Sequence, residues 1–201
     1  GVVAGAAVQS DGTVVLAANI GSASPGGLTS VNLNGADSTS GGAVIRLSGT
    51  GTTIVSVTRV GQVVTDLAVG PDDTLCVAAM GDGLVVLDAE ASSVLWSSTY
   101  ADSVHRVDVG TDGSVVALVH DDSDWDTVSS PGGGTLYLYD AQGAEIGNRG
   151  GHHNTLDVAY DAASQTVVSG GWRQFNTAGN PVQVSHLYVH DTSATLEQVW
   201  Q

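Results

Sequence analysis

A run of acidic residues in segment 120–126, His-Asp-Asp-Ser-Asp-Trp-Asp, is the most chemically distinctive part of the sequence. Its carboxylates are hard oxygen ligands, which Ca²⁺ takes in groups of six to eight, and they come from Asp121, Asp122, Asp124 and Asp126. The alternation starts like a calcium-binding loop, but no glycine follows it and its twelfth position is Gly133 rather than a bidentate glutamate. The sequence leaves two interpretations open, a calcium site and a solvated acidic loop, and it indicates no other cofactor.

Histidines offer a second kind of chemistry. His152 and His153 are adjacent, and we expect them in the link between the last two of the repeats described below. With a carboxylate beside them, imidazoles can bind a transition metal or act as acid and base near neutral pH. The competing interpretation is a pair of linker histidines without a chemical task.

Tryptophans in two expected long loops suggest a binding surface. One loop contains Trp125, and the other contains Trp172 followed by Arg173. An exposed indole beside a guanidinium group can stack against a sugar ring and hydrogen-bond to it. The alternative is that each tryptophan packs its own loop onto the body of the protein.

Motifs of common enzymes are missing from the chain. It contains no Gly-x-Ser-x-Gly elbow, no phosphate-binding loop and no His-Glu-x-x-His sequence. These absences favour a non-catalytic role. They do not exclude an enzyme, because a site built from aspartates of several repeats has no local motif.

Charge and composition narrow the partners. The 201 residues include 5 Lys+Arg and 21 Asp+Glu, so the net charge of −16 disfavours nucleic acid and anionic membrane surfaces. Neutral glycans, cations and protein partners stay compatible with it. No stretch reaches the roughly 18 apolar residues that a membrane-spanning helix needs, so we expect no membrane insertion. Cys76 is the only cysteine, which rules out an internal disulfide and predicts a buried thiol.

An internal repeat supplies the elements that would position these groups. Segments 5–18, 66–79, 106–119 and 157–170 can be stacked without gaps. Each reads as an alternating strand, a turn and a second apolar strand. The turns carry Asp11, Asp72, Asp112 and, in the fourth segment, Asp161 close to Ala163. One β-hairpin is therefore predicted four times.

Two further strands follow each hairpin. The third strands are expected near 43–47, 84–88, 136–140 and 186–191, and the fourth near 53–57, 94–96, 145–146 and 197–200. Four antiparallel strands in about 40 residues make the unit of a propeller blade. The sequence thus predicts an all-β chain, residues 1–201 forming a single β-propeller domain or fragment. Its four four-stranded blades are expected at about 1–61, 62–101, 102–151 and 152–201.

The loops identify one face of this propeller as the binding face. The connection between the second and third strands varies in length from blade to blade, and insertions that map to one place in a repeat often mark the binding face. The same end of each blade is where the first strand starts. Those starts carry Gly5, Asp66, Arg106 and Asp157, which would meet at the mouth of a central channel if the ring closes. They could form a small polar site or a network that ties the blades together.

One stretch carries a family resemblance. Residues 84–96, Leu-Val-Val-Leu-Asp-Ala-Glu-Ala-Ser-Ser-Val-Leu-Trp, resemble the repeat of pyrroloquinoline-quinone-type propellers, and residues 188–200 are a weaker version. The other units are similar to bacterial extracellular propeller repeats. The resemblance implies a bacterial extracellular or cell-envelope location and a fold rather than an activity. It transfers no quinone site, because a vicinal cysteine pair and a recognisable ligand set are both missing from the sequence.

Three arrangements and three functions follow from these patterns. The blades can close a four-bladed ring, belong to a longer ring, or form half of a ring that self-associates. The first function is a non-catalytic module for binding or assembly. The second is an enzyme fragment, a glycan hydrolase or lyase or a quinoprotein-like dehydrogenase, with an aspartate site at the channel mouth. The third is a structural subunit that polymerises through exposed strand edges.

Overall fold

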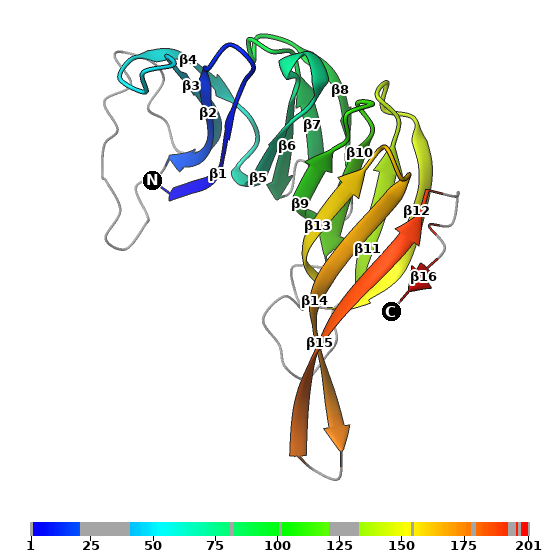
Figure 1. Ribbon diagram of the computed structural model, residues 1–201. Coiled ribbons are helices and arrows are strands. Elements are labelled where there is room, and N and C mark those ends of the chain that lie inside the picture. The colour runs from blue at the N-terminus through cyan, green and yellow to red at the C-terminus, as the bar shows by residue number, and fades with distance from the viewer. Residues whose placement is uncertain are drawn as a thin grey trace. The chain divides into compact units, whose positions relative to one another are not determined.

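The computed structural model describes residues 2–20, 41–80, 83–100, 102–120, 133–153, 155–177, 180–192, 196 and 198–200. These residues form four four-stranded antiparallel sheets, in each of which the strands follow one another in chain order (Figure 1). The helical content of the described residues is a single 3₁₀ turn, Pro71–Asp73. The predicted all-β class is therefore confirmed.

Each sheet is one blade, and its strands are numbered along the chain. Blade 1 comprises β1 (Val2–Val8), β2 (Val14–Ile20), β3 (Gly41–Leu47) and β4 (Ile54–Arg59). Blade 2 comprises β5 (Val63–Val69), β6 (Leu75–Met80), β7 (Gly83–Leu87) and β8 (Val94–Ser98). Blade 3 comprises β9 (Ser103–Val109), β10 (Val115–His120), β11 (Gly133–Tyr139) and β12 (Glu145–His153). Blade 4 comprises β13 (Thr155–Asp161), β14 (Thr166–Thr177), β15 (Asn180–Asp191) and β16 (Gln198–Trp200).

The hairpin that opens each blade has a local cause in the sequence. In blade 1, the β1–β2 turn closes with the Gln9 amide donating to the Thr13 carbonyl at 2.9 Å, and Gly12 adopts φ 86° between them. Glycine takes this left-handed conformation without a steric cost. Asp11 completes the turn by accepting a hydrogen bond from the Thr13 amide at 2.8 Å. The predicted Asp-Gly turn is thus present.

The chain divides into two compact units, Gly1–Val104 and His105–Gln201. The first unit has a core between blades 1 and 2, where Val15, Ala17 and Val44 pack with Val64, Leu67, Leu75, Val77 and Leu87. The second has a core between blades 3 and 4, where Val116, Leu118, Leu136 and Leu138 pack with Val158, Tyr160, Val167 and Leu196. Burial of aliphatic side chains between neighbouring sheets is the main stabilising term in each unit.

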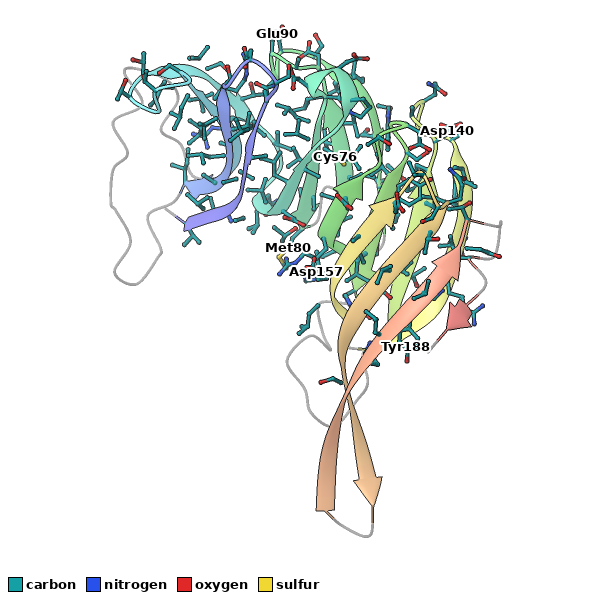
Figure 2. All side chains as sticks on the ribbon, viewed as in Figure 1. Cys76, Met80, Glu90, Asp140, Asp157 and Tyr188 are labelled. Atoms are coloured by element: carbon teal, nitrogen blue, oxygen red, sulfur yellow. The ribbon has the colours of Figure 1, made fainter. Side chains whose placement is uncertain are left out.

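Cys76 lies on β6 inside blade 2 (Figure 2). Its side chain is 1% exposed, as expected for a lone cysteine in an apolar strand. The thiol is free of any disulfide and is surrounded by the first unit.

Two segments expected to be loops or links are strands. His152 and His153 end β12, where they pair with Gly134 and Gly133 of β11 beyond a bulge. Trp172 and Arg173 belong to β14, because the β14–β15 register runs unbroken from Thr166↔Asp191 to Thr177↔Asn180. We expected a long loop between the second and third strands of this unit, but the segment contains residues that favour strands, such as Trp172 and Phe175.

Candidate functional site

Most aspartates of the described turns accept hydrogen bonds from main-chain amides of the same turn. Asp112, Asp140 and Asp161 accept hydrogen bonds from main-chain amides two to four residues further along, as Asp11 does. Asp88 accepts from both the amide and the hydroxyl of Ser92, at 2.6 and 2.7 Å. Hydrogen bonds to the ionised form of a carboxyl favour that form. These aspartates therefore stabilise turns, which accounts for part of the acidity of the chain.

The same hydrogen bonds lower the pKa of three of these carboxyls. Thr13 lowers the pKa of Asp11 mainly through its amide, Ser92 lowers that of Asp88 mainly through its hydroxyl, and Ser164 does the same for Asp161. A general acid needs a raised pKa, so these exposed groups are poor candidates for acid catalysis.

The channel-mouth positions show a shared local geometry. Asp66 accepts a hydrogen bond from the amide of Leu67 at 2.9 Å, and Asp157 accepts one from the amide of Val158 at 3.0 Å. Within the first unit, Gly5 packs closely against blade 2, since a Cβ on Gly5 would lie 2.9 Å from the Leu67 nitrogen. The backbone of Gly5 therefore lies close to Leu67, the residue that follows Asp66.

In the second unit, Arg106 donates from Nη1 to the carbonyl of the preceding residue, His105, at 2.8 Å. The arginine is half-buried, whereas Asp157 of the same unit is exposed (Figure 2). A joint site of the four positions stays a prediction.

The acidic loop with Asp121, Asp122, Asp124 and Asp126 lies outside the described residues, as does Trp125. Within the described ranges, no three His, Cys, Asp or Glu side chains gather into a group that could hold a metal ion. The calcium prediction therefore stays a prediction for that loop.

Buried histidines of the second unit act between blades. His120 ends β10 and is 2% exposed, and its Nε2 lies 3.2 Å from the carbonyl oxygen of Thr155 at the start of β13. Its ring meets that of His105 edge to face, with centroids 5.5 Å apart. A proton on Nε2 makes the contact with Thr155 a hydrogen bond that joins blade 3 to blade 4. The sequence had singled out His152 and His153, but not this pair.

The repeat explains why His120 lies there. Asn19 occupies the same repeat position in blade 1, fourteen residues after Gly5 as His120 is after Arg106. The side-chain amide of Asn19 makes two hydrogen bonds to Val64 of blade 2. Its Nδ2 donates to the carbonyl of Val64 at 2.8 Å, and its Oδ1 accepts from the main-chain amide of Val64 at 2.7 Å. A polar residue at the end of an apolar second strand was the signal available in the sequence.

A second set of ties lies at the opposite end of the blades. In the first unit, Gln9 is 4% exposed and donates to the carbonyls of Asp73 and Ala89 at 3.0 and 2.7 Å, while its Oε1 accepts from Arg46 at 3.2 Å. The neighbouring Ser10 donates from its amide and hydroxyl to the two carboxylate oxygens of Asp73. These contacts bind the turns of blades 1 and 2 to each other.

In the second unit, Tyr160 of blade 4 joins the turns of blades 3 and 4. Its amide donates to Asp108 at 2.7 Å, its hydroxyl donates to Asp112 at 3.3 Å, and its ring covers Gly110. A Cβ on Gly110 would lie 2.5 Å from two ring carbons, so only glycine leaves room for the tyrosine. Burial, and then the nearby Asp112 charge, raise the pKa of Tyr160. The hydroxyl therefore stays a neutral hydrogen-bond donor.

The β14–β15 hairpin extends beyond the rest of blade 4 (Figure 1). Strand β13 pairs with β14 no further than Gly171, and β16 pairs with β15 at Val189 and His190. The register of β14 with β15 nevertheless continues for six more pairs, from Trp172↔Ser185 to Thr177↔Asn180. We call residues 172–177 and 180–185 the ribbon. Among the described strands, none pairs with either edge of it.

The fold and its ties define a β-propeller protein built of four-stranded blades. Solved structures that share this fold include the hydrazine synthase of Kuenenia stuttgartiensis, at 19% identity and a TM-score of 0.65. The RRP9 WD40 repeats match at 13% identity and 0.63, and BamB from Moraxella catarrhalis at 17% and 0.59. The chain is covered to 94%, 94% and 97% in these matches.

The matched proteins differ in length from this chain. It spans about half of them, 51% of the hydrazine synthase chain, 53% of the RRP9 chain and 46% of BamB. It spans 90% of the computationally designed Ika4 protein, with 14% identity and a TM-score of 0.60. No protein-family model and no curated protein matches the sequence. At these identities the structural matches establish the propeller fold and leave the function to the residues themselves.

No helix in the described part of the chain has the length and apolar character to cross a lipid bilayer.

Proposed function

We propose that the chain is a non-catalytic binding module of a bacterial extracellular or cell-envelope protein, and that its ribbon contacts a neutral glycan. The location rests on the resemblance of its repeats to bacterial extracellular propellers. The ribbon carries the proposal because a two-stranded hairpin alone is marginally stable in water. A six-pair extension without a third strand needs a partner or a function to account for it.

The residues of the ribbon favour a glycan as that partner. Positions 172, 174 and 176 alternate along β14 and carry Trp, Gln and Asn, and the register pairs them with Ser185, Gln183 and Pro181. The sequence of the ribbon thus combines an indole with amides and a hydroxyl, a composition that suits a neutral sugar, which has an apolar ring face and hydroxyls at its rim. Neither Arg173 nor the net charge of −16 argues against a neutral ligand.

The remaining polar groups support a role without catalysis. The described turn aspartates bond their own backbone, and Asn19, His120, Gln9 and Tyr160 join blades. Asp66 and Asp157 also bond the next amide in the chain. Because these groups have structural uses, the ribbon of blade 4 is the best candidate for ligand contact among the described residues.

Affinity electrophoresis tests the proposal. The gels contain starch, soluble cellulose, glycol chitin or xylan. We expect at least one of these glycans to retard the wild-type chain, and Trp172→Ala to abolish the retardation. Phe175→Ala is the matched control, because it removes an aromatic residue from the other set of alternating ribbon positions and should leave the retardation intact.

Three outcomes would contradict the proposal. Equal loss in both variants would mean that the ribbon acts through its fold rather than through Trp172. Release of new reducing ends from a retarding glycan, abolished by Asp66→Asn or Asp157→Asn, would instead establish an enzyme with a channel-mouth site. A chain that no glycan retards would favour a protein partner for the ribbon.

A further inference from the structure

Three turns of the first unit meet at Gln9 and collect acidic side chains. Gln9 donates to the carbonyls of Asp73, in the turn after β5, and of Ala89, in the turn after β7. The amide and the hydroxyl of Ser10, in the turn after β1, donate to the carboxylate of Asp73 at 2.7 and 2.6 Å. We call these three turns the turn end of the first unit. Their acidic residues are Asp11, Asp72, Asp73, Asp88 and Glu90, the last of which is labelled in Figure 2.

Positive charge at this turn end comes from Arg46 of β3. Its Nε donates to the Gln9 side chain at 3.2 Å, and its Nη1 donates to the main-chain carbonyl of Glu90 at 3.5 Å. Both acceptors are uncharged, so among the described residues this guanidinium donates to no carboxylate. Arg59, the other arginine of the unit, donates to the carbonyl of Gly41 at the far end of β3. Five carboxylates and one guanidinium therefore give the turn end a net charge of −4.

These carboxylates stay charged in neutral solution. The Thr13 amide lowers the pKa of Asp11, and the Ser92 hydroxyl lowers that of Asp88. Burial of a carboxyl would oppose its ionisation, but every acidic side chain that the structure describes is exposed or half-buried. The turn end therefore presents its negative charge to the solvent.

The second unit has acidic turns of the same kind. Asp112 and Asp161 lie where β9 and β13 turn into the next strand, and Asp140 lies in the turn after β11. We call these turns the turn end of the second unit. Tyr160 donates to Asp108 through its amide and to Asp112 through its hydroxyl, so two carboxylates lie around one tyrosine. Acidic turns therefore recur at the corresponding positions of both units.

The chain as a whole lacks the positive charge that would balance these turns. Residues 1–104 carry 9 acidic residues and 2 arginines, a charge of −7, and residues 105–201 carry 12 and 3, a charge of −9. The sequence contains no lysine. A net charge this far from zero destabilises the compact state through self-repulsion. The buried core that opposes this repulsion in the first unit is built of Val, Ala and Leu side chains.

We infer that the chain requires concentrated salt for its full stability, because dissolved cations screen the two turn ends as a diffuse atmosphere. The Debye length is about 30 Å at 0.01 M salt and about 3 Å at 1 M. The carboxylates of one turn end therefore repel one another in dilute buffer and are screened from one another in molar salt. A bound ion is not needed for this effect, and within the described ranges no three His, Cys, Asp or Glu side chains gather to hold one. Stability should follow the ionic strength and not the identity of the cation.

Thermal unfolding of the 201-residue chain, followed by circular dichroism at neutral pH, measures this dependence. The midpoint should rise by roughly 5 °C or more as NaCl increases from about 0.01 M to about 1 M, and KCl should act equally. Sucrose is the control for effects of an excluded solute, because it strengthens burial without screening charge. Micromolar Ca²⁺ at constant ionic strength should leave the midpoint unchanged.

Removal of charge at the turn end distinguishes screening from other effects of salt. Asp72→Asn and Glu90→Gln, combined in one variant, remove two carboxylates and keep polar side chains. Asp72 has φ 55°, a conformation that asparagine tolerates. The variant should unfold at a higher temperature than wild type in dilute buffer and should gain less from NaCl, while its response to sucrose stays the same. Glu90→Asp is the matched control, because it keeps the charge and should keep the salt response of wild type.

A wild-type midpoint that does not change with NaCl would overturn the inference. Stabilisation by micromolar Ca²⁺ that NaCl does not reproduce would also overturn it, because a bound ion would then replace screening. If the double variant kept the full response to NaCl, the turn end would not be the source of the repulsion. Glycan retardation tests the proposed function separately, because both substituted residues lie outside the ribbon.

Discussion

The two units solve the same packing problem with different residues at the same repeat positions. In the first, Gln9 reaches from blade 1 into the turns of blade 2, and the position corresponding to Tyr160 is the smaller Val69. In the second, the position corresponding to Gln9 is Gly110, and Tyr160 of blade 4 reaches back over it. A side chain projects from one blade in each case, and the other blade leaves the space. The contact between neighbouring blades thus falls at the same repeat positions in both units, but different residues form it in each unit.

This difference predicts unequal sensitivity to truncation. Tyr160→Ala removes a buried ring whose hydroxyl donates to Asp112, and should destabilise the second unit by about 3–5 kcal/mol, the usual range for a large aromatic core residue. Tyr160→Phe keeps the ring and should lose about 0.5–1.5 kcal/mol with the hydroxyl. Denaturant unfolding followed by hydrogen exchange checks both values. Equal losses in the two variants would show that the hydroxyl rather than the ring is the tie.

Gln9→Ala is the corresponding test in the first unit, and we expect a smaller effect. It leaves the carbonyls of Asp73 and Ala89 without their side-chain donor, which should cost about 1–3 kcal/mol. Faster exchange should be confined to amides of residues 2–104. Gln142→Ala, in an exposed turn of blade 3, is the control and should stay within about 0.5 kcal/mol of wild type. A loss spread evenly over both units would contradict separate ties.

Mild acid should distinguish the units, because all six histidines lie in the second. His190 is fully buried, with Nδ1 3.1 Å from the Leu196 carbonyl oxygen, and burial lowers its pKa below the usual 6.5. Arg149 lowers this pKa further, and Asp191 opposes the shift. The unfolded chain therefore takes up a proton at a higher pH than the folded one. Stability of the second unit should fall as pH drops below about 6.5.

Hydrogen exchange at pH 7 and pH 5.5, corrected for intrinsic rates, measures this difference. Amides of residues 105–201 should lose more protection than those of residues 2–104. His190→Gln should reduce the pH dependence of the second unit, whatever its effect on stability at pH 7. Parallel loss in both units of the wild type would show that His190 does not carry the effect.

Stronger acid should destabilise both units, so the difference in stability between them should disappear. The loss of stability per titrating residue should be the smallest of the effects predicted here. Asp11 and Asp88 in the first unit and Asp161 in the second have lowered pKa values, so their contribution is present above about pH 3.8 and is lost as pH falls below it. Asp88→Asn should flatten the response of the first unit between pH 4 and pH 2.5, measured by circular dichroism during thermal unfolding. An unchanged response would mean that the Ser92 contacts do not favour the ionised carboxyl.

The sequence predicted local structure well because the signals for it are local. Alternating apolar residues around Asp11-Gly12 and Asp112-Gly113 specify a hairpin without reference to the rest of the chain. The fourfold repetition then identified the blade. The end of β12 and the long β14–β15 register were missed because their glycines also suit loops, and pairing with the neighbouring strand decides between the two.

The ties between blades were beyond the sequence for a different reason. Gly110 leaves room for the ring of Tyr160, which lies fifty residues further along the chain, and the sequence alone does not show that the two residues are neighbours. Of the candidate site residues, Asp66 and Asp157 each accept a hydrogen bond from the next amide in the chain, a contact that was not predicted from the sequence. Their joint role, and the roles of Trp172 and Arg173, depend on a ligand, which no single sequence specifies.

Because Cys76 is buried, its reaction with a thiol reagent can measure how fast the first unit opens. A thiol reagent can modify the side chain only after blade 2 opens, and the chain has no second thiol to compete with it. The labelling rate in excess reagent therefore reports the opening kinetics of the first unit alone, under native conditions and without an introduced probe.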